Sequence, residues 1–338
     1  MHLTVKKTSG KIMAFLLIFL SISGYAGVCS AAFTIEDEKR LGKEFYDKLK
    51  DKDIFIDNQR VVNYINKLGK RLVEYAGDTP PFDFTFTVIK DSGINAFATP
   101  GGYIYVYSGL VGITNNESQL AGVLAHEIAH VQARHIAKTI EKSQKIGIGT
   151  LAALLAGAFL GGGGEATAAI TSFSLATATS LNLKYSREHE EEADRMGISC
   201  LLNAGYDGRG MYDFLKIMRT YEFYSNSVPS YFMTHPGTTD RISYIDGLLQ
   251  VRNRHDGANN IIGDYDRIKT ILYLDGKNLD TKFNTLSQRL TENPDDIEAL
   301  YRMAVVQSKT GRIAESLEYF DRALALSPGD ADMLRDLG

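Results

Sequence analysis

The stretch Leu124-Ala125-His126-Glu127-Ile128-Ala129-His130 lies inside an apolar segment and contains the pattern H-E-x-x-H. Apolar residues have helical spacing from 117 to 142, so we expect one continuous helix over these residues. Residues four apart lie on one face of a helix, and the imidazoles of His126 and His130 therefore point toward the same cation. Neutral histidine nitrogens are common zinc ligands, and Glu127 is placed to take a proton from a water that attacks a carbonyl. The segment predicts a hydrolytic zinc site.

A catalytic zinc ion normally has three protein ligands and one open position, so the site needs a third ligand. The acidic segment 186–194 is the best source. Its helical spacing places His189 within a buried face and Glu190 at the edge of that face, so spacing alone leaves both as candidates. Asp194 lies one turn beyond Glu190 and can hydrogen-bond a ligand histidine. The other acids, Glu192 among them, are expected to face solvent.

The rest of the first 262 residues predicts an α+β fold in which helices dominate. Helical spacing extends from 34 to 77, and a second long helix is expected at 186–203. Alternating residues predict strands at 82–88 and at Tyr103–Tyr107. The second strand is either an edge strand on which an extended peptide substrate lies or an ordinary core strand.

One further histidine lies close to the H-E-x-x-H pattern. His135 follows His126 by nine residues. Nine residues of a continuous helix correspond to about 180° of rotation, so we expect His135 to point away from the zinc face and to make core or surface hydrogen bonds.

The first thirty residues predict a secretory signal. A basic start precedes a short apolar core at 12–22, and small residues follow. That core is shorter than the ~20 residues needed to span a membrane. We expect cleavage after Ala31 or Ala32 and export to a bacterial periplasm, with acylation of Cys29 as a lipoprotein anchor as the alternative. Cleavage leaves Cys200 as the only cysteine, so the exported chain has no internal disulfide.

The last part of the chain has a helical repeat pattern. Asn293-Pro294-Asp295-Asp296 and Ser327-Pro328-Gly329-Asp330 lie 34 residues apart, which is the period of a tetratricopeptide (TPR) repeat. The residues that match the large, small, turn and aromatic positions of that unit are Leu300, Met303, Ala304, Gly311, Ser316, Phe320 and Ala323. Residues 263–292 look like a degenerate helical pair that leads into it. One unit cannot bury both faces alone, so the repeat is either cut short or packs against the preceding domain.

These patterns divide the chain into three parts. We expect a signal peptide at 1–31, a metallopeptidase domain at 32–262 and a truncated TPR-like helical region at 263–338. Two apolar stretches between 146 and 183 flank Gly161–Gly164. They predict either a buried helical pair or a mobile lid with peripheral membrane contact.

Four motifs, in order, resemble those of a known family. They are Asn95-Ala96-Phe97-Ala98, His126-Glu127-x-x-His130-x-x-x-Arg134-His135, Ser186-Arg187-x-x-Glu190-x-x-Ala193-Asp194 and His235-Pro236-x-x-x-x-Arg241-Ile242. Together they resemble the gluzincin metallopeptidases that include CAAX prenyl proteases, HtpX-like proteases and periplasmic BepA-like proteins. The resemblance implies a zincin-like fold, one Zn²⁺ per chain and Glu190 as the third ligand. The signal and the repeat are most similar to the periplasmic members, and the clear membrane helices of the other branches are missing.

The resemblance also places the fourth motif, which contains His235 and Arg241, beside the active site. Pro236 disfavours helical backbone at the preceding residue, so His235 is expected in a loop. His235 then either donates to the oxyanion or takes the fourth zinc position and holds the enzyme latent, with a structural loop histidine as the alternative. Arg241 is expected either to stabilise the oxyanion or to form a surface ion pair.

We therefore predict a zinc-dependent endopeptidase of the bacterial envelope that cleaves exported or misassembled proteins. The TPR-like region is expected to recruit protein substrates or envelope assembly proteins. The formal net charge of −4 and a sequence pI of about 6.0 give no reason to expect a nucleic-acid partner. Two alternatives remain: a periplasmic chaperone or outer-membrane assembly factor with a latent zinc site, and a membrane-embedded protease that uses the apolar stretches at 146–183.

Overall fold

The computed structural model describes residues 33–141, 151–152, 155–157, 185–224, 229–252, 257–275 and 278–338. The expected signal peptide at 1–31 lies outside the described residues, and so does almost all of the apolar segment at 146–183. Within the described ranges, no helix is both long enough and apolar enough to cross a membrane.

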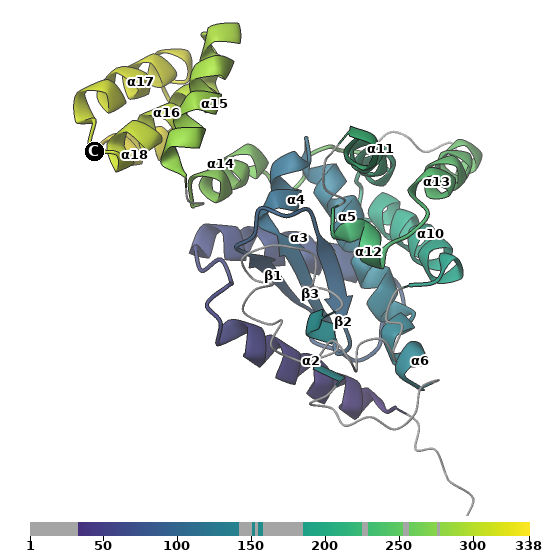
Figure 1. The fold of residues 1–338 in the computed structure, drawn as a ribbon. Helices are drawn as coiled ribbons and strands as arrows, with labels where there is room; N and C mark the ends of the chain where they lie inside the picture. Colours follow the sequence, from purple (N-terminus) through teal and green to yellow (C-terminus); the bar gives the residue numbers. More distant parts are fainter. Residues whose placement is uncertain are drawn as a thin grey trace, which may run out of the picture. The chain divides into compact units, whose positions relative to one another are not determined.

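Helices account for most of the described chain, as Figure 1 shows. The first group consists of α2 (Ile35–Lys50), α3 (Gln59–Tyr75), α4 (Ser108–Ile113), α5 (Glu117–Gln132) and α6 (His135–Glu141). The second consists of α10 (Arg187–Asn203), α11 (Arg209–Tyr224), α12 (Tyr231–Thr234) and α13 (Thr238–Arg252). The last consists of α14 (Tyr265–Asp275), α15 (Leu279–Glu292), α16 (Ile297–Lys309), α17 (Ile313–Leu326) and α18 (Ala331–Leu337). The helix-dominated α+β class is confirmed.

The sheet has three strands, β1 (Thr85–Ile89), β2 (Ala96–Thr99) and β3 (Tyr103–Tyr107), in the order β1-β3-β2. β3 is parallel to β1 and antiparallel to β2. The expectation that Tyr103–Tyr107 is an edge strand is therefore wrong, because both of its sides are hydrogen-bonded to neighbours. β2 lies at an edge instead. The strand expected at 82–88 begins only at Thr85.

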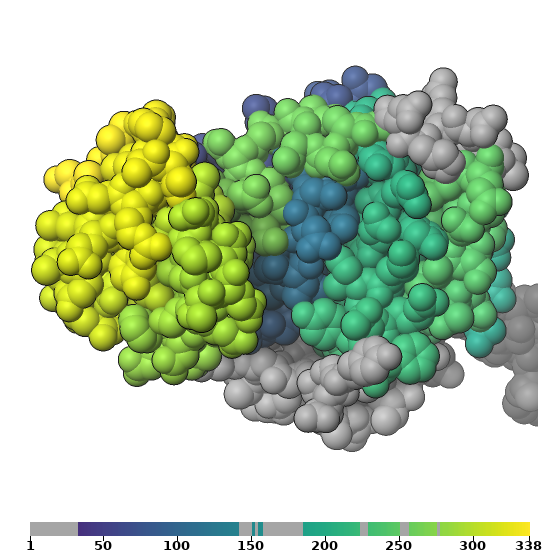
Figure 2. Space-filling view, turned by 90° about the horizontal axis from the view of Figure 1, so that it is seen from above, coloured from purple at the N-terminus to yellow at the C-terminus, as the bar shows by residue number. Residues whose placement is uncertain are grey.

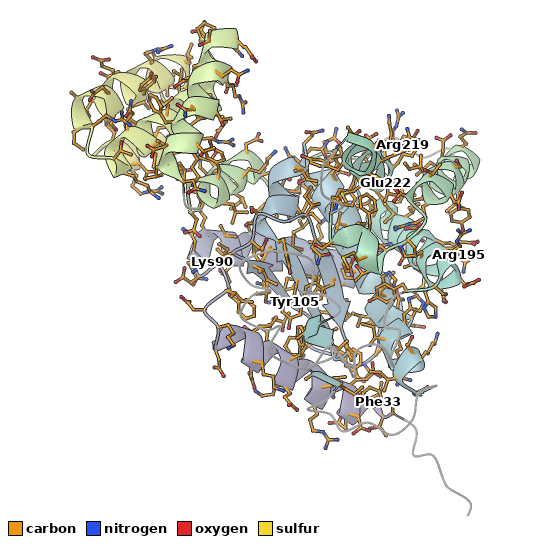
Figure 3. The ribbon with its side chains drawn as sticks, viewed as in Figure 1. Phe33, Lys90, Tyr105, Arg195, Arg219 and Glu222 are labelled. Carbon is orange, nitrogen blue, oxygen red and sulfur yellow. The ribbon has the colours of Figure 1, made fainter. Side chains whose placement is uncertain are left out.

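The turn between β2 and β3 brings α2 onto the sheet. Gly101 has a φ of +85°, which a residue with a side chain rarely adopts. A Cβ atom at this position would lie 2.8 Å from the carbonyl oxygen of Glu38 in α2. Tyr105, labelled in Figure 3, packs its ring against Phe45 of α2 at 5.6 Å between centroids. The glycine and the aromatic pair together allow α2 to cover one side of the sheet.

α5 is the central helix of the fold. It is apolar on nearly all sides, which is typical of a fully buried helix, and its residues 117–131 are buried. It packs against α10, α11, α3 and the sheet. In the space-filling view of Figure 2, the green and teal helices leave only a narrow strip of the blue part of the chain in view. The H-E-x-x-H pattern therefore lies in the core and not on the surface.

The continuous helix expected over 117–142 is wrong. α5 ends at Gln132, Arg134 has a φ of +54°, and α6 begins at His135. A positive φ costs a residue with a side chain of order 1–2 kcal/mol. The guanidinium of Arg134 offsets this cost because its Nε lies 2.6 Å from the buried carboxylate of Glu38. The break changes the direction of the chain immediately after the metal-binding pattern.

The C-terminal helices α14–α18 form a bundle with small apolar cores of their own. α16 and α17 pack closely and bury Leu300, Ala304, Phe320 and Ala323 between them, in a cluster that Met333 of α18 completes. The helical pair expected at 263–292 corresponds to α14 and α15. Helices thus lie where the repeat pattern predicts them, and the assignment to the TPR class stays a prediction.

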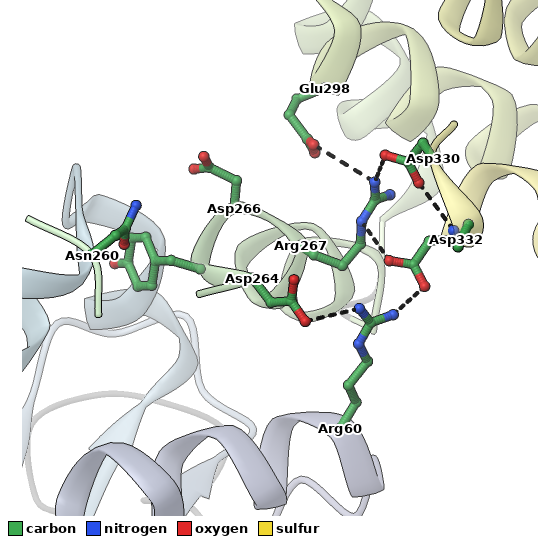
Figure 4. A pocket seen from close by; sticks show the side chains of 10 residues that line it. Arg60, Asn260, Asp264, Asp266, Arg267, Glu298, Asp330 and Asp332 are labelled. Carbon is green, nitrogen blue, oxygen red and sulfur yellow. Dashed lines mark hydrogen bonds and ion pairs between the residues drawn. The ribbon is translucent and has the colours of Figure 1, made fainter. Parts of the chain in front are cut away.

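A pocket of about 420 Å³ lies where α14, α16 and α18 meet the start of α3. Arg60 of α3 pairs with Asp264 and Asp332, and Arg267 of α14 pairs with Asp330 and Asp332, as Figure 4 shows. The pocket is lined by charged residues that largely pair with one another. None of the predicted site residues lines it.

Candidate metal centre

α5 carries two histidines and a glutamate on adjacent turns. His126 and His130 are four residues apart, and their Nε2 atoms lie 3.0 Å from each other. Glu127 lies between them in the sequence, and all three side chains are almost completely buried. The helical spacing predicted from the sequence thus brings two imidazole nitrogens to one point in the core.

α10 adds a carboxylate to this pair. The helix begins after Ser186, whose hydroxyl oxygen accepts a hydrogen bond from the backbone N–H of His189. Gly197 lets α10 approach α5 closely, because a Cβ atom there would lie 3.1 Å from the backbone nitrogen of His126. Glu190 then places Oε1 3.4 Å from His130 Nε2 and Oε2 3.5 Å from His126 Nε2. His189, the other candidate left open by spacing, stacks on His135 instead.

A third histidine completes the group from the other side. His235 follows α12 with φ −116° and ψ 88°, which is the non-helical backbone expected before Pro236. Its Nδ1 lies 3.1 Å from Glu190 Oε1 and 3.3 Å from His126 Nε2. Its ring stacks on Tyr231 with centroids 4.4 Å apart, and its backbone N–H donates to the carbonyl of the same residue.

These four side chains fit a zinc ion. The ligand atoms of His126, His130, Glu190 and His235 form one buried group. Five distances between these atoms, from 3.0 to 3.5 Å, match the edge of a tetrahedron with ligand bonds of about 2.0–2.1 Å, which is about 3.3 Å. Neutral imidazoles and a carboxylate are the donors that zinc takes in catalytic sites. His235 thus contributes a fourth candidate ligand atom to this group.

Asp194 and Arg241 form a second layer around the ligands. Asp194 Oδ1 lies 2.9 Å from His126 Nδ1, so it can accept that N–H and leave Nε2 free for a cation. Arg241 is only 6% exposed, so the surface ion pair considered for it is wrong. Its Nη1 lies 2.6 Å from Glu190 Oε2, and its Nε and Nη2 donate to Asp194.

Burial and the neighbouring charges shift the pKa values of Glu190 and Glu127 in opposite directions. Burial by itself raises the pKa of Glu190, but the positive charge of Arg241 and the histidine neighbours outweigh it and lower the pKa well below its usual value. Burial raises the pKa of Glu127, and the nearby histidines oppose that shift only in part. Glu190 is therefore held as an anion, and Glu127 is the better proton acceptor.

Two aromatic residues in the centre carry no signal in the sequence. Tyr185 stacks on the imidazole of His130 with centroids 3.7 Å apart, and its backbone N–H donates to Thr234. Tyr231 stacks on His235.

His135 lies in a different place from the one expected. Its Nδ1 lies 2.8 Å from His130 Nδ1, so the side chain does not point away. The expectation that it points away is wrong because the chain bends at Arg134, whereas the expected core hydrogen bonds are present. Glu192, expected to face solvent, contacts His135 Nε2 at 3.1 Å while its side chain stays 41% exposed.

Comparison with known proteins identifies similar sequences. The family model described as "Peptidase family M48" matches residues 59–249, more than half of the chain and all of the centre. The beta-barrel assembly-enhancing protease of Yersinia pestis is 30% identical over 316 residues, which cover 91% of this chain and 64% of that protein. Its namesake in Escherichia coli K12 is 34% identical over 66% of this chain and 45% of its own length.

A more distant match comes from mitochondria. A mitochondrial metalloendopeptidase of Schizosaccharomyces pombe is 28% identical over 64% of this chain and 62% of that protein. All three relatives are longer than the matched part, and the chain spans between about half and two thirds of their lengths.

Proposed function

Because the chain belongs to peptidase family M48, we propose that it is a zinc-dependent endopeptidase of the bacterial envelope. His126, His130 and Glu190 are the proposed zinc ligands. The observation that carries this proposal is the convergence of four buried ligand atoms beside Glu127. Asp194 and His135 can accept the Nδ1 protons of His126 and His130, so the two Nε2 lone pairs face each other at 3.0 Å, an arrangement that a cation stabilises.

The chemistry follows from the groups around that point. A zinc ion held there polarises the scissile carbonyl and lowers the pKa of water. Glu127 accepts the proton of the attacking water and passes it to the leaving amine. Neither carboxylate oxygen of Glu127 has a hydrogen-bond partner among the described residues, and Oε1 lies 3.4 Å from His235 Nε2, which leaves Oε2 available for this transfer.

Asp194 and Arg241 orient the ligands in this proposal. Asp194 accepts from His126 and fixes the tautomer that turns Nε2 toward zinc. Arg241 is engaged by Asp194 and Glu190, which favours alignment of Glu190 over direct contact with an oxyanion. Of these residues, His235 and not Arg241 is therefore our candidate for donating a hydrogen bond to the oxyanion.

His235 supports a second proposal, that the resting enzyme is latent. Its Nδ1 lies within 3.3 Å of ligand atoms of both Glu190 and His126, so it can occupy the fourth zinc position. A zinc ion with four protein ligands has no open position for water. Displacement of His235 would open this position, and the oxyanion role is the alternative to this blocking role.

The edge strand supports an extended peptide as the substrate. β2 lies at the edge of the sheet, and its Ala98 and Thr99 line the same small pocket as His130 and Tyr185. A peptide that pairs with an edge strand is held by main-chain hydrogen bonds, which give little sequence selectivity. All four residues of β2 are buried, so pairing with a peptide along residues 96–99 requires this edge to become exposed when substrate binds.

The relatives suggest a cellular role. Two of them are named beta-barrel assembly-enhancing proteases, so we propose that this chain acts on outer-membrane proteins during their assembly in the periplasm. We propose the division into a signal peptide at 1–31, a peptidase domain at 32–262 and a TPR-like region at 263–338 that binds protein partners. The alternative is an assembly chaperone whose zinc site stays latent.

The test combines metal content with digestion of casein. Wild type, Glu127→Gln and His235→Ala are purified as the full chain, zinc is measured, and peptide release is followed. We expect one zinc per chain in all three, loss of roughly 10²–10⁴-fold in activity for Glu127→Gln, and higher activity for His235→Ala. Full activity in Glu127→Gln would contradict the proposed mechanism.

A complementation experiment separates protease from chaperone. Cells with an outer-membrane assembly defect receive wild type or Glu127→Gln. Failure of the variant to rescue supports proteolysis as the cellular role. Rescue equal to that of wild type favours the chaperone alternative.

A further inference from the structure

One of the proposed zinc ligands has an unexpected neighbour on its far side. The Nδ1 atom of His130 lies 2.8 Å from the Nδ1 atom of His135. His135 is completely buried, and its Nε2 lies 3.1 Å from the carboxylate of Glu192. A chain of two hydrogen-bond contacts therefore leads from a partly exposed acid in α10 to a buried ligand in α5.

The distances permit one arrangement of protons when a cation is bound. A neutral His130 that offers Nε2 to zinc carries its proton on Nδ1, and this N–H then donates to His135 Nδ1. His135 must in turn carry its proton on Nε2, where it donates to Glu192 Oε2. Each of these ring nitrogens is then either a donor or an acceptor. The series of hydrogen bonds ends at the negatively charged carboxylate of Glu192.

The backbone is built to bring His135 to this place. A continuous helix would turn His135 to the opposite side of α5 from the ligands. The positive φ of Arg134 breaks the helix, and the ion pair between Arg134 and buried Glu38 holds the turn. The imidazole of His135 also stacks on His189 with centroids 4.3 Å apart and 17° between the planes. Backbone strain and an ion pair at Arg134, together with ring stacking at His135, thus hold His135 in place.

The two helical ligands differ in how they are supported. His126 reaches a carboxylate directly, because Asp194 Oδ1 lies 2.9 Å from its Nδ1. The Nδ1 atom of His130, on the side away from Glu190, reaches the carboxylate of Glu192 through His135. We propose that His135 is a positioning residue that fixes the tautomer and ring orientation of His130, and that Glu192 anchors the far end of the chain. This inference rests on the proposed function, since it takes His130 as a zinc ligand.

Two substitutions at position 135 separate positioning from packing. His135→Phe keeps a planar ring for the stack with His189 but offers no acceptor to His130. His135→Asn packs less well but keeps an acceptor oxygen close to the place of Nδ1. If His135 acts only through packing, His135→Phe should bind zinc more tightly than His135→Asn. If His135 positions His130, the order of the two affinities should be reversed.

The measurement is zinc affinity of the full chain by competition with a chromophoric chelator. We expect His135→Phe to bind zinc about 10–100-fold more weakly than wild type and His135→Asn to stay within about fivefold. Glu192→Ala is expected to bind several-fold more weakly, while its neighbour Glu191→Ala, which is exposed on the same helix, matches wild type. The visible spectrum of the Co²⁺-loaded protein should change in His135→Phe and stay close to wild type in His135→Asn.

The outcomes distinguish this inference from the proposed function. Zinc binding that is normal in wild type and unchanged in His135→Phe overturns the inference alone. A zinc affinity that is higher in His135→Phe than in His135→Asn also overturns the inference alone. Should His135→Phe fail to fold, equal affinities of Glu192→Ala and Glu191→Ala overturn it. A wild type that binds no more zinc than His126→Ala overturns both the inference and the proposed function.

Discussion

Arg241 donates to both carboxylate oxygens of Asp194, with Nε 2.8 Å from Oδ2 and Nη2 2.7 Å from Oδ1. This two-pronged contact is almost completely buried, and the third nitrogen of the same guanidinium reaches Glu190 at 2.6 Å. A planar guanidinium matches a carboxylate in this geometry, and lysine cannot reproduce it. One cation therefore pairs with two buried acids at the metal centre.

Replacement of Arg241 by Ala should destabilise the protein strongly. Asp194 and Glu190 would remain buried without their counter-charge, and breaking a buried pair in this way costs about 3–5 kcal/mol. The free energy of unfolding is measured by urea titration of the zinc-free protein. Arg187→Ala serves as the control, because its contact with Asp240 is 3.6 Å long and exposed, and we expect it to change stability by less than about 1 kcal/mol. Equal losses in the free energy of unfolding for the two variants would contradict a stabilising role of the buried Arg241 contacts.

Replacement of His235 by Ala should raise peptidase activity at unchanged zinc content. In the latent arrangement only the fraction of molecules with His235 displaced is competent, and a tenfold excess of the closed form leaves about tenfold to gain. Initial rates of casein digestion are compared with zinc content on the same samples. As a matched control, Thr238→Ala changes a buried residue near the same loop without removing an imidazole. A fall in activity after His235→Ala would instead indicate the oxyanion role.

The thiol of Cys200 should be inert in the folded protein. It is buried in α10 against the carbonyl of Leu72, and burial raises its pKa to about 12. Thiolate is the reactive form and appears only as pH approaches the pKa, so labelling by iodoacetamide at pH 8 should be far slower than in urea. A full chain with Cys29→Ser isolates this thiol. Labelling of the native and unfolded samples at similar rates would contradict the burial.

Glu117 should be one of the most sensitive positions outside the metal centre. It begins α5, is buried, and accepts hydrogen bonds from Tyr64, Tyr206 and the backbone N–H groups of Ile261 and Ile262. Glu117→Ala leaves these buried donors without an acceptor, and we expect a loss of about 3–5 kcal/mol in the free energy of unfolding.

The control for Glu117 is an acid of another helix. Glu44→Ala in α2 removes an exposed acid that pairs with Lys48 across one helical turn, and such a pair contributes less than about 1 kcal/mol. Thermal unfolding of both variants makes the comparison. If Glu117→Ala unfolds at the temperature of wild type, the contacts of this carboxylate are not stabilising.

Much of the fold follows from local patterns in the chain. The apolar segment around H-E-x-x-H predicts a buried helix, and α5 is that helix. The amphipathic repeat after residue 262 predicts helices, and α14–α18 lie there. β2 was missed because its four residues are all buried and so show no alternation. Short strands of this kind depend on their neighbours more than on their own sequence.

The shared face of His126 and His130 follows from the sequence, because the apolar segment predicts a helix and residues four apart lie on one face of a helix. The motif that follows Ser186 also indicates the segment that holds Glu190. The positions of His135 and Arg241, in contrast, depend on the tertiary structure. His135 reaches His130 because the backbone breaks at Arg134, where no glycine or proline announces a break. Arg241 is buried because two acids from another helix neutralise it, and contacts between helices distant in sequence leave no periodic signal.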